Sequence, residues 1–230
     1  MRVVAIIPAY NEAKSIAQVV AATLPHVEQV VVVDDGSKDD TAALAREAGA
    51  HTLVQPCNAG KGAALQAGTD YALQAGFDAL VALDADGQHD PNSIPALIEP
   101  VTAGSADMSV GSRKREWSKH MPWVRRMTND LMSRFLSWVA GQPMEDTQSG
   151  YRCISVKVLR GVHVETTHFE AESEFLLRAA RAGFRIAWVP IKSIYGSDMR
   201  PSHIHPVRDA LRFLKMLVRI MREHRGGRRA

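Results

Sequence analysis

The chain has 230 residues, of which 46% are hydrophobic, so it can bury one sizeable α/β core or two small ones. Its two cysteines, Cys57 and Cys153, show neither a CxxC pattern nor metal-ligand spacing, which excludes a disulfide framework and is typical of the reducing cytosol. No apolar stretch approaches the roughly 20 residues that span a bilayer, and the N-terminus lacks the features of a signal peptide. We therefore expect a cytoplasmic protein.

The net charge of +3 hides an asymmetry between the body of the chain and its end. Residues 199–230 carry nine Lys and Arg against two acids, whereas residues 1–198 carry 19 against 23. A nearly neutral body with a basic tail predicts an anionic partner for the tail. Composition alone leaves both nucleic acid and anionic lipid open.

Apolar β-branched runs alternate with helical patterns through the first half of the chain. The predicted strands are Val3–Ile7, Gln29–Val33, His51–Gln55 and Asp78–Leu83, and the predicted helices are Asn11–Leu24, Thr41–Ala48 and Lys61–Ala75. Continuous apolar strands in this order predict a mostly parallel sheet with helices on both faces. The loops that follow such strands meet at one edge of the sheet, so we expect the site there.

The second half is less regular. Strands are predicted at Ala106–Val110, Tyr151–Ser155 and Phe184–Val189, and helices at 122–139, Ala171–Ala182 and Pro206–Arg222. The helix over 122–139 carries one apolar stripe, formed by Val124, Met127, Leu131, Phe135 and Trp138. No internal repeat, low-complexity stretch or clear linker interrupts the chain, which favours one domain.

The sequence Asp84-Ala85-Asp86 directly follows the apolar run 79–83. Because the chain turns just beyond a strand, both carboxylates can converge on one cation there. Mg²⁺ and Mn²⁺ suit such a place, since they take one or two carboxylates together with phosphate oxygens of a substrate. The pattern therefore favours diphosphate chemistry. The alternative is a polar turn, because Asp86-Gly87 is a common turn dipeptide.

Acidic and glycine-rich loops follow the second and third strands. Asp34 and Asp35 can accept hydrogen bonds from a ribose or a base, or they can cap the next helix. Gly60-Lys61-Gly62 lacks the spacing of a P-loop, yet Lys61 at a helix start suits a phosphate as well as it suits solvent. The alternating acids Glu170, Glu172 and Glu174 open a helix, and we interpret them as cap and dipole chemistry.

Read together, these segments resemble the family 2 glycosyltransferases of the GT-A fold. The match runs from residue 3 to about residue 195 and is carried by Ile7-Pro8-Ala9-Tyr10-Asn11-Glu12, Val33-Asp34-Asp35-Gly36-Ser37, Asn58–Gly62, Asp84-Ala85-Asp86, Gly111-Ser112-Arg113 and Asp146…Ser149-Gly150-Tyr151-Arg152. Within the family, Asp-Ala-Asp-x-Gln-His, Gly-Ser-Arg and Asp-x-x-Ser-Gly are most similar to the dolichyl/polyprenyl-phosphate sugar transferases. The resemblance implies a single α/β GT-A domain that binds a nucleotide-diphosphate-sugar over residues 1–205, and a basic helix and tail over 206–230.

The resemblance also implies roles for individual residues. The nucleoside of a UDP- or GDP-sugar would contact Pro8, Tyr10, Glu12, Asp34 and Asp35. Asp84, Asp86 and Gln88 would surround Mg²⁺ or Mn²⁺, which neutralises charge as the nucleotide leaves. Arg113 and Asp146 are the predicted catalytic residues, and Arg113 supplies a positive donor near phosphate. The other predicted substrate contacts are Lys61, Ala85, Ser149 and Arg200. Arg200 ends the segment Tyr195–Arg200, a loose match to a family loop, and His203 and His205 just beyond it are further candidates.

These features predict an inverting, metal-dependent transferase that moves a hexose from a nucleotide-sugar to a lipid (polyprenyl) phosphate. A phosphate acceptor is already anionic at pH 7, whereas a hydroxyl acceptor requires a general base, for which Asp146 is the candidate. The alternatives are transfer to a sugar or other hydroxyl acceptor, and a non-catalytic nucleotide-sugar-binding module at a membrane surface. We expect no nucleic-acid partner, because an aromatic-rich surface and a helix-turn-helix pattern are missing. A homo-oligomer remains open.

The predicted final helix is both basic and amphipathic. Its cationic stripe consists of Arg208, Arg212, Lys215, Arg219 and Arg222, and its apolar stripe of Val207, Leu211, Leu214, Val218 and Met221, widened by Phe213, Leu217 and Ile220. Such a helix can lie on an anionic membrane surface, here on the cytoplasmic face. The alternative is a terminal helix that packs its apolar face on the domain, and the two interpretations are compatible.

Overall fold

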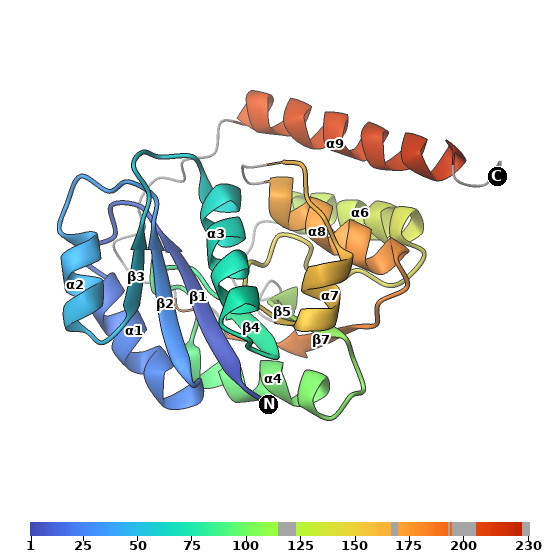
Figure 1. The fold of residues 1–230 in the computed structure, drawn as a ribbon. Coiled ribbons are helices and arrows are strands. Elements are labelled where there is room, and N and C mark those ends of the chain that lie inside the picture. The colour runs from blue at the N-terminus through green and yellow to red at the C-terminus, as the bar shows by residue number, and fades with distance from the viewer. Residues whose placement is uncertain (115–122, 167–169, 193, 195–205, 227–230) are drawn as a thin grey trace.

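The computed structural model describes residues 1–114, 123–166, 170–192, 194 and 206–226, which fold around one mixed sheet (Figure 1). The strands are β1 (Val3–Ala9), β2 (Gln29–Asp34), β3 (His51–Val54), β4 (Ala79–Ala82), β5 (Met108–Ser112), β6 (Arg152–Ser155) and β7 (Ile186–Pro190). The seven strands lie in the order β3-β2-β1-β4-β6-β5-β7. The predicted α/β class with a mostly parallel sheet is confirmed.

The first four strands are all parallel to their neighbours in this half of the sheet. Their crossovers are α1 (Ile16–Thr23), α2 (Thr41–Glu47) and α3 (Lys61–Gln74). Val4 of β1 pairs with Gln29 of β2 on one side and with Leu80 of β4 on the other. This register brings the ends of β1, β2 and β4 to the same edge, the upper edge in Figure 1, where the predicted site loops begin.

The second half departs from this pattern, because β6 runs antiparallel to both β4 and β5. Its helices are α4 (Ile94–Thr102), α6 (Trp123–Ala140), α7 (Val156–Gly161), α8 (Glu170–Arg181) and α9 (Pro206–Gly226). Helices α4 and α7 were not predicted from the sequence. Pro95 and Pro100 conceal α4, although Pro is tolerated in the first helical turn and Ala103 still closes the helix onto Glu99.

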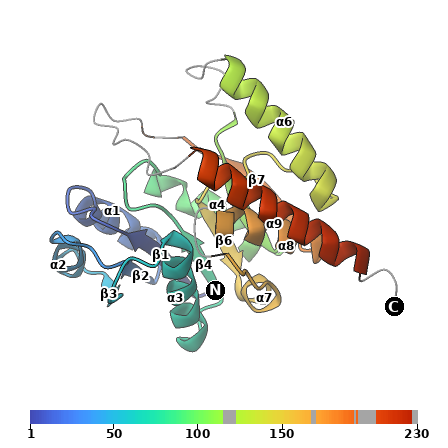
Figure 2. The ribbon, with the colours of Figure 1, turned by 90° about the horizontal axis from the view of Figure 1, so that it is seen from above.

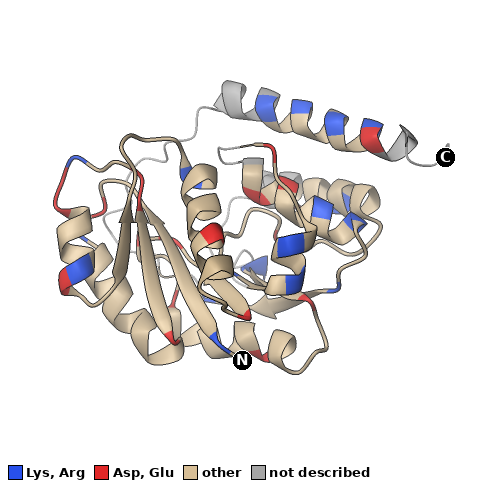
Figure 3. Ribbon diagram, viewed as in Figure 1, with Lys and Arg blue, Asp and Glu red and all other residues tan. Residues whose placement is uncertain are grey.

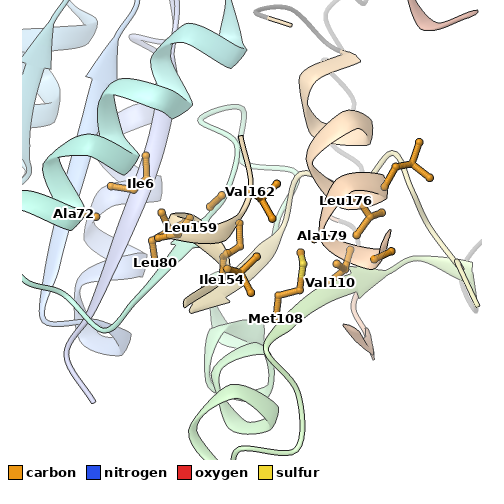
Figure 4. Close-up of a cluster of buried hydrophobic side chains, with 14 of the residues drawn as sticks. Ile6, Ala72, Leu80, Met108, Val110, Ile154, Leu159, Val162, Leu176 and Ala179 are labelled. Carbon is orange, nitrogen blue, oxygen red and sulfur yellow. The ribbon is translucent and has the colours of Figure 1, made fainter. Parts of the chain in front are cut away.

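Alternation along the strands divides the core between the two faces of the sheet. Val4 and Ile6 of β1 point to one face, where Leu80, Met108, Ile154 and Leu176 pack under α3, α7 and α8 (Figure 4). Val3, Ala5 and Ile7 point to the other face, under α1 and α4. Full burial of one such Ile or Leu contributes about 1.5–3 kcal/mol, so each face fixes its helices on the sheet.

Helix α9 packs on α8, and α6 flanks α8 as well (Figure 2). Met216, Leu217 and Ile220 of α9 are buried in the core, whereas Leu214 and Val218 remain exposed. This result confirms the alternative in which the final helix packs on the domain. Lys and Arg recur along the helix in Figure 3. Across the described residues, no helix combines the length and apolar character needed to cross a membrane.

The stripe predicted on the helix over 122–139 lies on α6, and its described members face outward. Leu131 and Trp138 are 68% and 72% exposed, and Met127 and Phe135 are also exposed. Leu136, on the opposite side, is fully buried and holds α6 on the core. The apolar periodicity was therefore sufficient to predict a helix, but the face that packs carries fewer large apolar side chains than the face that does not.

Candidate active site

The loop after β4 places Asp84 in a network of alternating charges. Lys61 at the start of α3 approaches Asp84 Oδ1 with its Nζ at 2.5 Å and Glu172 Oε1 of α8 at 2.8 Å. Gly150 lies directly against all three groups, because a Cβ there would be 2.8 Å from Glu172 Oε1, 3.1 Å from Lys61 Nζ and 3.3 Å from Asp84 Oδ1. The site thus joins α3, β4, α8 and the segment before β6.

The charges in this network hold each other in the ionised form. Burial alone would raise the pKa of Asp84, but the positive charge of Lys61 and its hydrogen bond lower it to about 2. Burial would lower the pKa of Lys61, but Asp84 and Glu172 raise it above its ordinary value. Asp84 is therefore an anion at neutral pH, as a ligand of a divalent cation must be.

The donor set of the loop fits a hard divalent ion bound together with a substrate. Asp84 already attracts an ammonium group, and Asp86 lies two residues on with its Oδ1 accepting the main-chain N–H of Gln88 at 2.9 Å. No group of three or more His, Cys, Asp or Glu side chains in the described part of the chain is arranged to hold a metal by itself. Mg²⁺ does not need such a group, because it commonly binds through one or two carboxylates and completes its coordination shell with phosphate oxygens of a substrate.

The loops after β1 and β2 are locked to one another. The Asp34 carboxylate accepts the N–H and hydroxyl of Ser37, whose Oγ in turn accepts the N–H of Asn11 at 2.9 Å. Asn11 has a φ of 55°, the left-handed conformation that Asn tolerates. The main chain of Glu12 donates to Thr41 Oγ1 at 2.8 Å. These bonds join the loop that carries Glu12 to the loop that carries Asp34, and Pro8 and Tyr10 are half-buried on the first of the two.

Asp35 holds the loop that leads into α3 and Lys61. Its two carboxylate oxygens accept the main-chain N–H groups of Ala59 at 2.9 Å and Gly60 at 2.8 Å. Gly60 has a φ of 100°, a conformation that L side chains rarely adopt. Asp35 therefore does not cap the next helix but organises the loop that presents Lys61, and its contact with a nucleoside stays a prediction.

Arg113 and Asp146 form a two-point ion pair at the end of β5. Arg113 donates through Nε to Asp146 Oδ2 at 2.8 Å and through Nη2 to Oδ1 at 3.0 Å, and its main-chain N–H reaches Oδ2 at 3.2 Å. Asp146 is buried with 1% of its side chain exposed, whereas 26% of Arg113 is exposed. Paired donation of this kind fixes the guanidinium plane, so Asp146 orients Arg113 at the rim of the site.

Ser149 and Arg152 lie on either side of Gly150, the residue against the Lys61, Asp84 and Glu172 side chains. Ser149 Oγ is buried and has no hydrogen-bond partner among the described residues, which is uncommon for a hydroxyl unless a water or ligand completes it. Arg152 is also buried and donates to the main-chain oxygens of Ser149 at 2.7 Å and Glu172 at 2.6 Å. A cavity of about 670 Å³ is lined by Gly150, Arg152 and Glu172, with Leu65, Leu73 and Phe175 among its apolar walls.

Three contributors to the site, Glu172, His89 and Arg152, were not predicted from the sequence as site residues. Glu172 was interpreted as cap chemistry, together with Glu174, which lies fully buried beneath α9 instead. His89 was part of the quoted motif but received no role. The alternation of the acids was the available signal, since on a helix Glu172 and Glu174 point to different sides. Arg200, His203 and His205 lie outside the described residues.

The chain matches glycosyl transferase family 2 over residues 4–160, and it belongs to that family. It is 34% identical to a polyprenol monophosphomannose synthase of Mycolicibacterium smegmatis, covering 83% of this chain and 76% of that protein. It is 33% identical to a UDP-N-acetylglucosamine–dolichyl-phosphate N-acetylglucosaminyltransferase of Methanococcus voltae, covering 83% and 84% of the two chains. These relatives confirm the resemblance found in the motifs, and they differ in the sugar they are named for.

The fold is also similar to that of solved glycosyltransferases. Glucosyl-3-phosphoglycerate synthase from Mycobacterium tuberculosis, solved with Mg²⁺ and UDP, superposes with a TM-score of 0.68 at 20% identity, covering 96% of this chain and 78% of that one. At this identity the similarity concerns the fold, which is that of the GT-A glycosyltransferases.

Proposed function

We propose that this glycosyltransferase is inverting and metal-dependent and moves a hexose from a UDP- or GDP-sugar to a polyprenyl phosphate. The observation that carries the proposal is the anionic Asp84 at the carboxyl edge of the sheet, with Asp86 beside it and the cations Lys61 and Arg113 around it. A diphosphate held by a metal on these carboxylates would lie between fixed positive groups. Those groups stabilise the charge that develops as the nucleotide leaves.

The nucleoside of the sugar donor would contact Pro8, Tyr10, Glu12, Asp34 and Asp35, which lie on the linked loops after β1 and β2. Asp84, Asp86 and Gln88 would hold Mg²⁺ or Mn²⁺, with Ala85 between the two carboxylates. A bound divalent ion supplies charge neutralisation at the leaving diphosphate. Lys61 and Ser149 complete the proposed contacts, Lys61 as a cation and Ser149 through its unpaired buried hydroxyl.

The acceptor proposal rests on the state of Asp146 and on the relatives. Both oxygens of Asp146 are engaged by Arg113, so the carboxylate is better suited to holding Arg113 toward an acceptor phosphate than to taking a proton. A phosphate needs no strong base, because it is already ionised at pH 7. The relatives named for polyprenol and dolichyl-phosphate sugar transfer support the same acceptor class.

Transfer to a hydroxyl is the second candidate function, and Glu172 is the observation that favours it. Its carboxylate lies at the site, 13% exposed, with Lys61 2.8 Å from Oε1. A carboxylate in that place could accept the proton of an alcohol. The two functions differ in a measurable way, since only a hydroxyl acceptor makes turnover depend on that proton transfer.

We also propose that the protein works at the cytoplasmic surface of an anionic membrane. Lys215 and Arg222 of α9 are exposed, together with Leu214 and Val218. Arg219 instead turns inward and pairs with Glu174 Oε1 at 2.8 Å, so the cationic stripe is narrower than the sequence suggested. The outward apolar face of α6, formed by Met127, Leu131, Phe135 and Trp138, supplies aromatic and aliphatic groups of the kind that enter a headgroup region.

A donor screen tests the proposed function. Purified full-length protein is incubated with UDP-, GDP- and dTDP-hexoses, Mn²⁺ and a short polyprenyl phosphate, and the lipid product is identified by mass spectrometry. We expect one donor to give a hexosyl-phosphate lipid and EDTA to stop its formation. Turnover that continues in EDTA would overturn the metal assignment, and no product with any donor would overturn the proposed reaction.

A further inference from the structure

The loop that carries the carboxylates proposed to bind a metal begins where the sheet no longer provides hydrogen-bond partners for the main chain. The N–H of Leu83 still donates to Ile6 of β1 at 3.2 Å. Beyond it, the N–H of Asp84 donates to Nδ1 of His89 at 3.1 Å, five residues further along the chain. Since a buried N–H without an acceptor is costly, the His89 side chain replaces the strand partner that β4 lacks at this point.

This hydrogen bond defines the state of the imidazole. A main-chain N–H can only donate, so Nδ1 of His89 must be unprotonated and the proton of the neutral ring lies on Nε2. The residue is 6% exposed, and its ring stacks on Tyr151 with centroids 4.8 Å apart and planes at 17°. Tyr151 is fully buried and donates its hydroxyl to the main-chain oxygen of Asp90 at 2.9 Å.

The stacked rings of His89 and Tyr151 therefore hold both ends of the loop 84–90. His89 holds Asp84 at the start, Tyr151 holds Asp90 at the end, and the N–H of Ile194 fixes Gln88 from outside at 3.0 Å. The three groups proposed to surround the metal, Asp84, Asp86 and Gln88, all lie between these fixed points. Partners that orient metal ligands in this way tune metal affinity without touching the ion.

We propose that His89 is a positioning residue, which sets the Asp84 carboxylate by accepting its main-chain N–H through Nδ1 while stacking on Tyr151. The proposal deepens the proposed function and rests on it, because its consequence is the affinity of the loop for a divalent ion. The two parts of the interaction are separable by substitution. Asn can offer an acceptor oxygen near the place of Nδ1, whereas Phe keeps the stacked ring and offers none.

The test compares His89→Asn and His89→Phe with wild type in a Mn²⁺ titration followed by electron paramagnetic resonance, with UDP or GDP present. His89→Phe should weaken Mn²⁺ binding about 10- to 100-fold, and His89→Asn should recover most of that loss. Tyr151→Phe keeps the stack and serves as the matched control for the far end of the loop. Wild-type affinity in His89→Phe, or equal losses in both His89 variants with native near-UV circular dichroism, would overturn the proposal.

A second measurement uses metal-free protein and separates this inference from the proposed function. The ¹⁵N spectrum of wild-type His89 should show protonated Nε2 and unprotonated Nδ1, and the Asp84 amide should be protected from hydrogen exchange. His89→Phe should lose that protection and His89→Asn should keep it. A proton on Nδ1, or an unprotected Asp84 amide in the wild type, contradicts the positioning role. If both signatures are present but wild type binds no Mn²⁺, the metal assignment fails and the positioning role stands.

Discussion

The two halves of the sheet build their share of the site in different ways. Around β1, β2 and β4, several contacts join residues of the same loop, such as Asp34 with Ser37 and Asp84 with His89, and others link neighbouring loops, such as Asn11 with Ser37. Around β5, β6 and α8, they join distant segments, such as Arg113 with Asp146 and Lys61 with Glu172. The first half can therefore be recognised as motifs, whereas the second half exists only once the chain has folded.

The largest effect should come from the half with local contacts. Asp84→Asn removes a charge from the proposed metal shell and leaves Lys61 facing Glu172 alone, so turnover should fall by several orders of magnitude and donor binding should weaken. Circular dichroism should stay native, because no apolar group is lost from the core. Glu47→Gln, an exposed change on α2, is the control. Near wild-type turnover in Asp84→Asn would refute the assignment of the site.

Glu172→Gln tests whether the half built by distant contacts serves the same reaction. If Glu172 only holds Lys61 against Asp84, kcat/KM should fall about 10- to 100-fold with an unchanged pH profile. If it is a general base for a hydroxyl acceptor, kcat/KM should fall by more than this, and the pH–rate profile should lose the decrease in rate at low pH that protonation of the base causes. Steady-state kinetics across pH separates the two outcomes, and no change in either quantity would exclude Glu172 from the site.

Glu174 tests how much a buried carboxylate between α8 and α9 contributes to stability. Its buried carboxylate receives Arg178, Arg219 and Thr166, so Glu174→Gln should lower the free energy of unfolding by about 2–4 kcal/mol in urea titrations. Glu165→Gln removes the exposed partner of the same two arginines and should cost less than about 1 kcal/mol. Equal effects of the two changes would show that burial of Glu174 does not matter.

The same carboxylate gives the stability a pH dependence of known sign. Burial raises the pKa of Glu174, but hydrogen bonds from Thr166 and Arg178 lower it below its ordinary value of 4.5. Its contribution is therefore complete above about pH 4.5 and is lost as the pH falls below that value. Unfolding of Glu174→Gln should show less acid dependence than wild type, and an identical acid dependence would contradict this account.

The smallest expected effect is on membrane binding by the exposed faces of α6 and α9. Reversing Lys215 and Arg222 to Glu should reduce co-sedimentation with anionic vesicles at least about tenfold, since each base near such a surface contributes about 1 kcal/mol. Trp138→Ser on α6 should weaken binding and leave its salt dependence unchanged. Arg46→Glu on α2 is the control. Equal sedimentation of wild type and the double reversal would exclude α9 as a membrane contact.

The comparison of the two halves also explains how far the sequence could predict the structure. Strand β4 and the carboxylates after it were predictable, because burial of a parallel strand produces a continuous apolar run and its end must turn. Helix α4 was not, because Pro100 contradicts local propensity and tertiary packing of Ile94, Leu97 and Val101 overrides it. Apolar periodicity on α6 and α9 predicted helices, but periodicity cannot tell which part of a wide apolar face packs on the protein.

The site followed the same division. The motifs predicted where Asp84 and Asp86 lie. Arg113 and Asp146 were each recognised in a motif, but the sequence did not show that they pair. The partner of Lys61 was beyond the sequence, since three acids at alternating positions look alike until the fold turns Glu172 toward α3 and Glu174 toward α9.

The central claim is that the acceptor is a lipid phosphate, and direct competition between two acceptors tests it. Wild-type protein is given Mn²⁺, the donor found in the screen, and equal amounts of a polyprenyl phosphate and the corresponding polyprenol. We expect mass spectrometry to detect the hexosyl-phosphate lipid and no glycosylated alcohol. Formation of the glycosylated polyprenol at a comparable rate would contradict it.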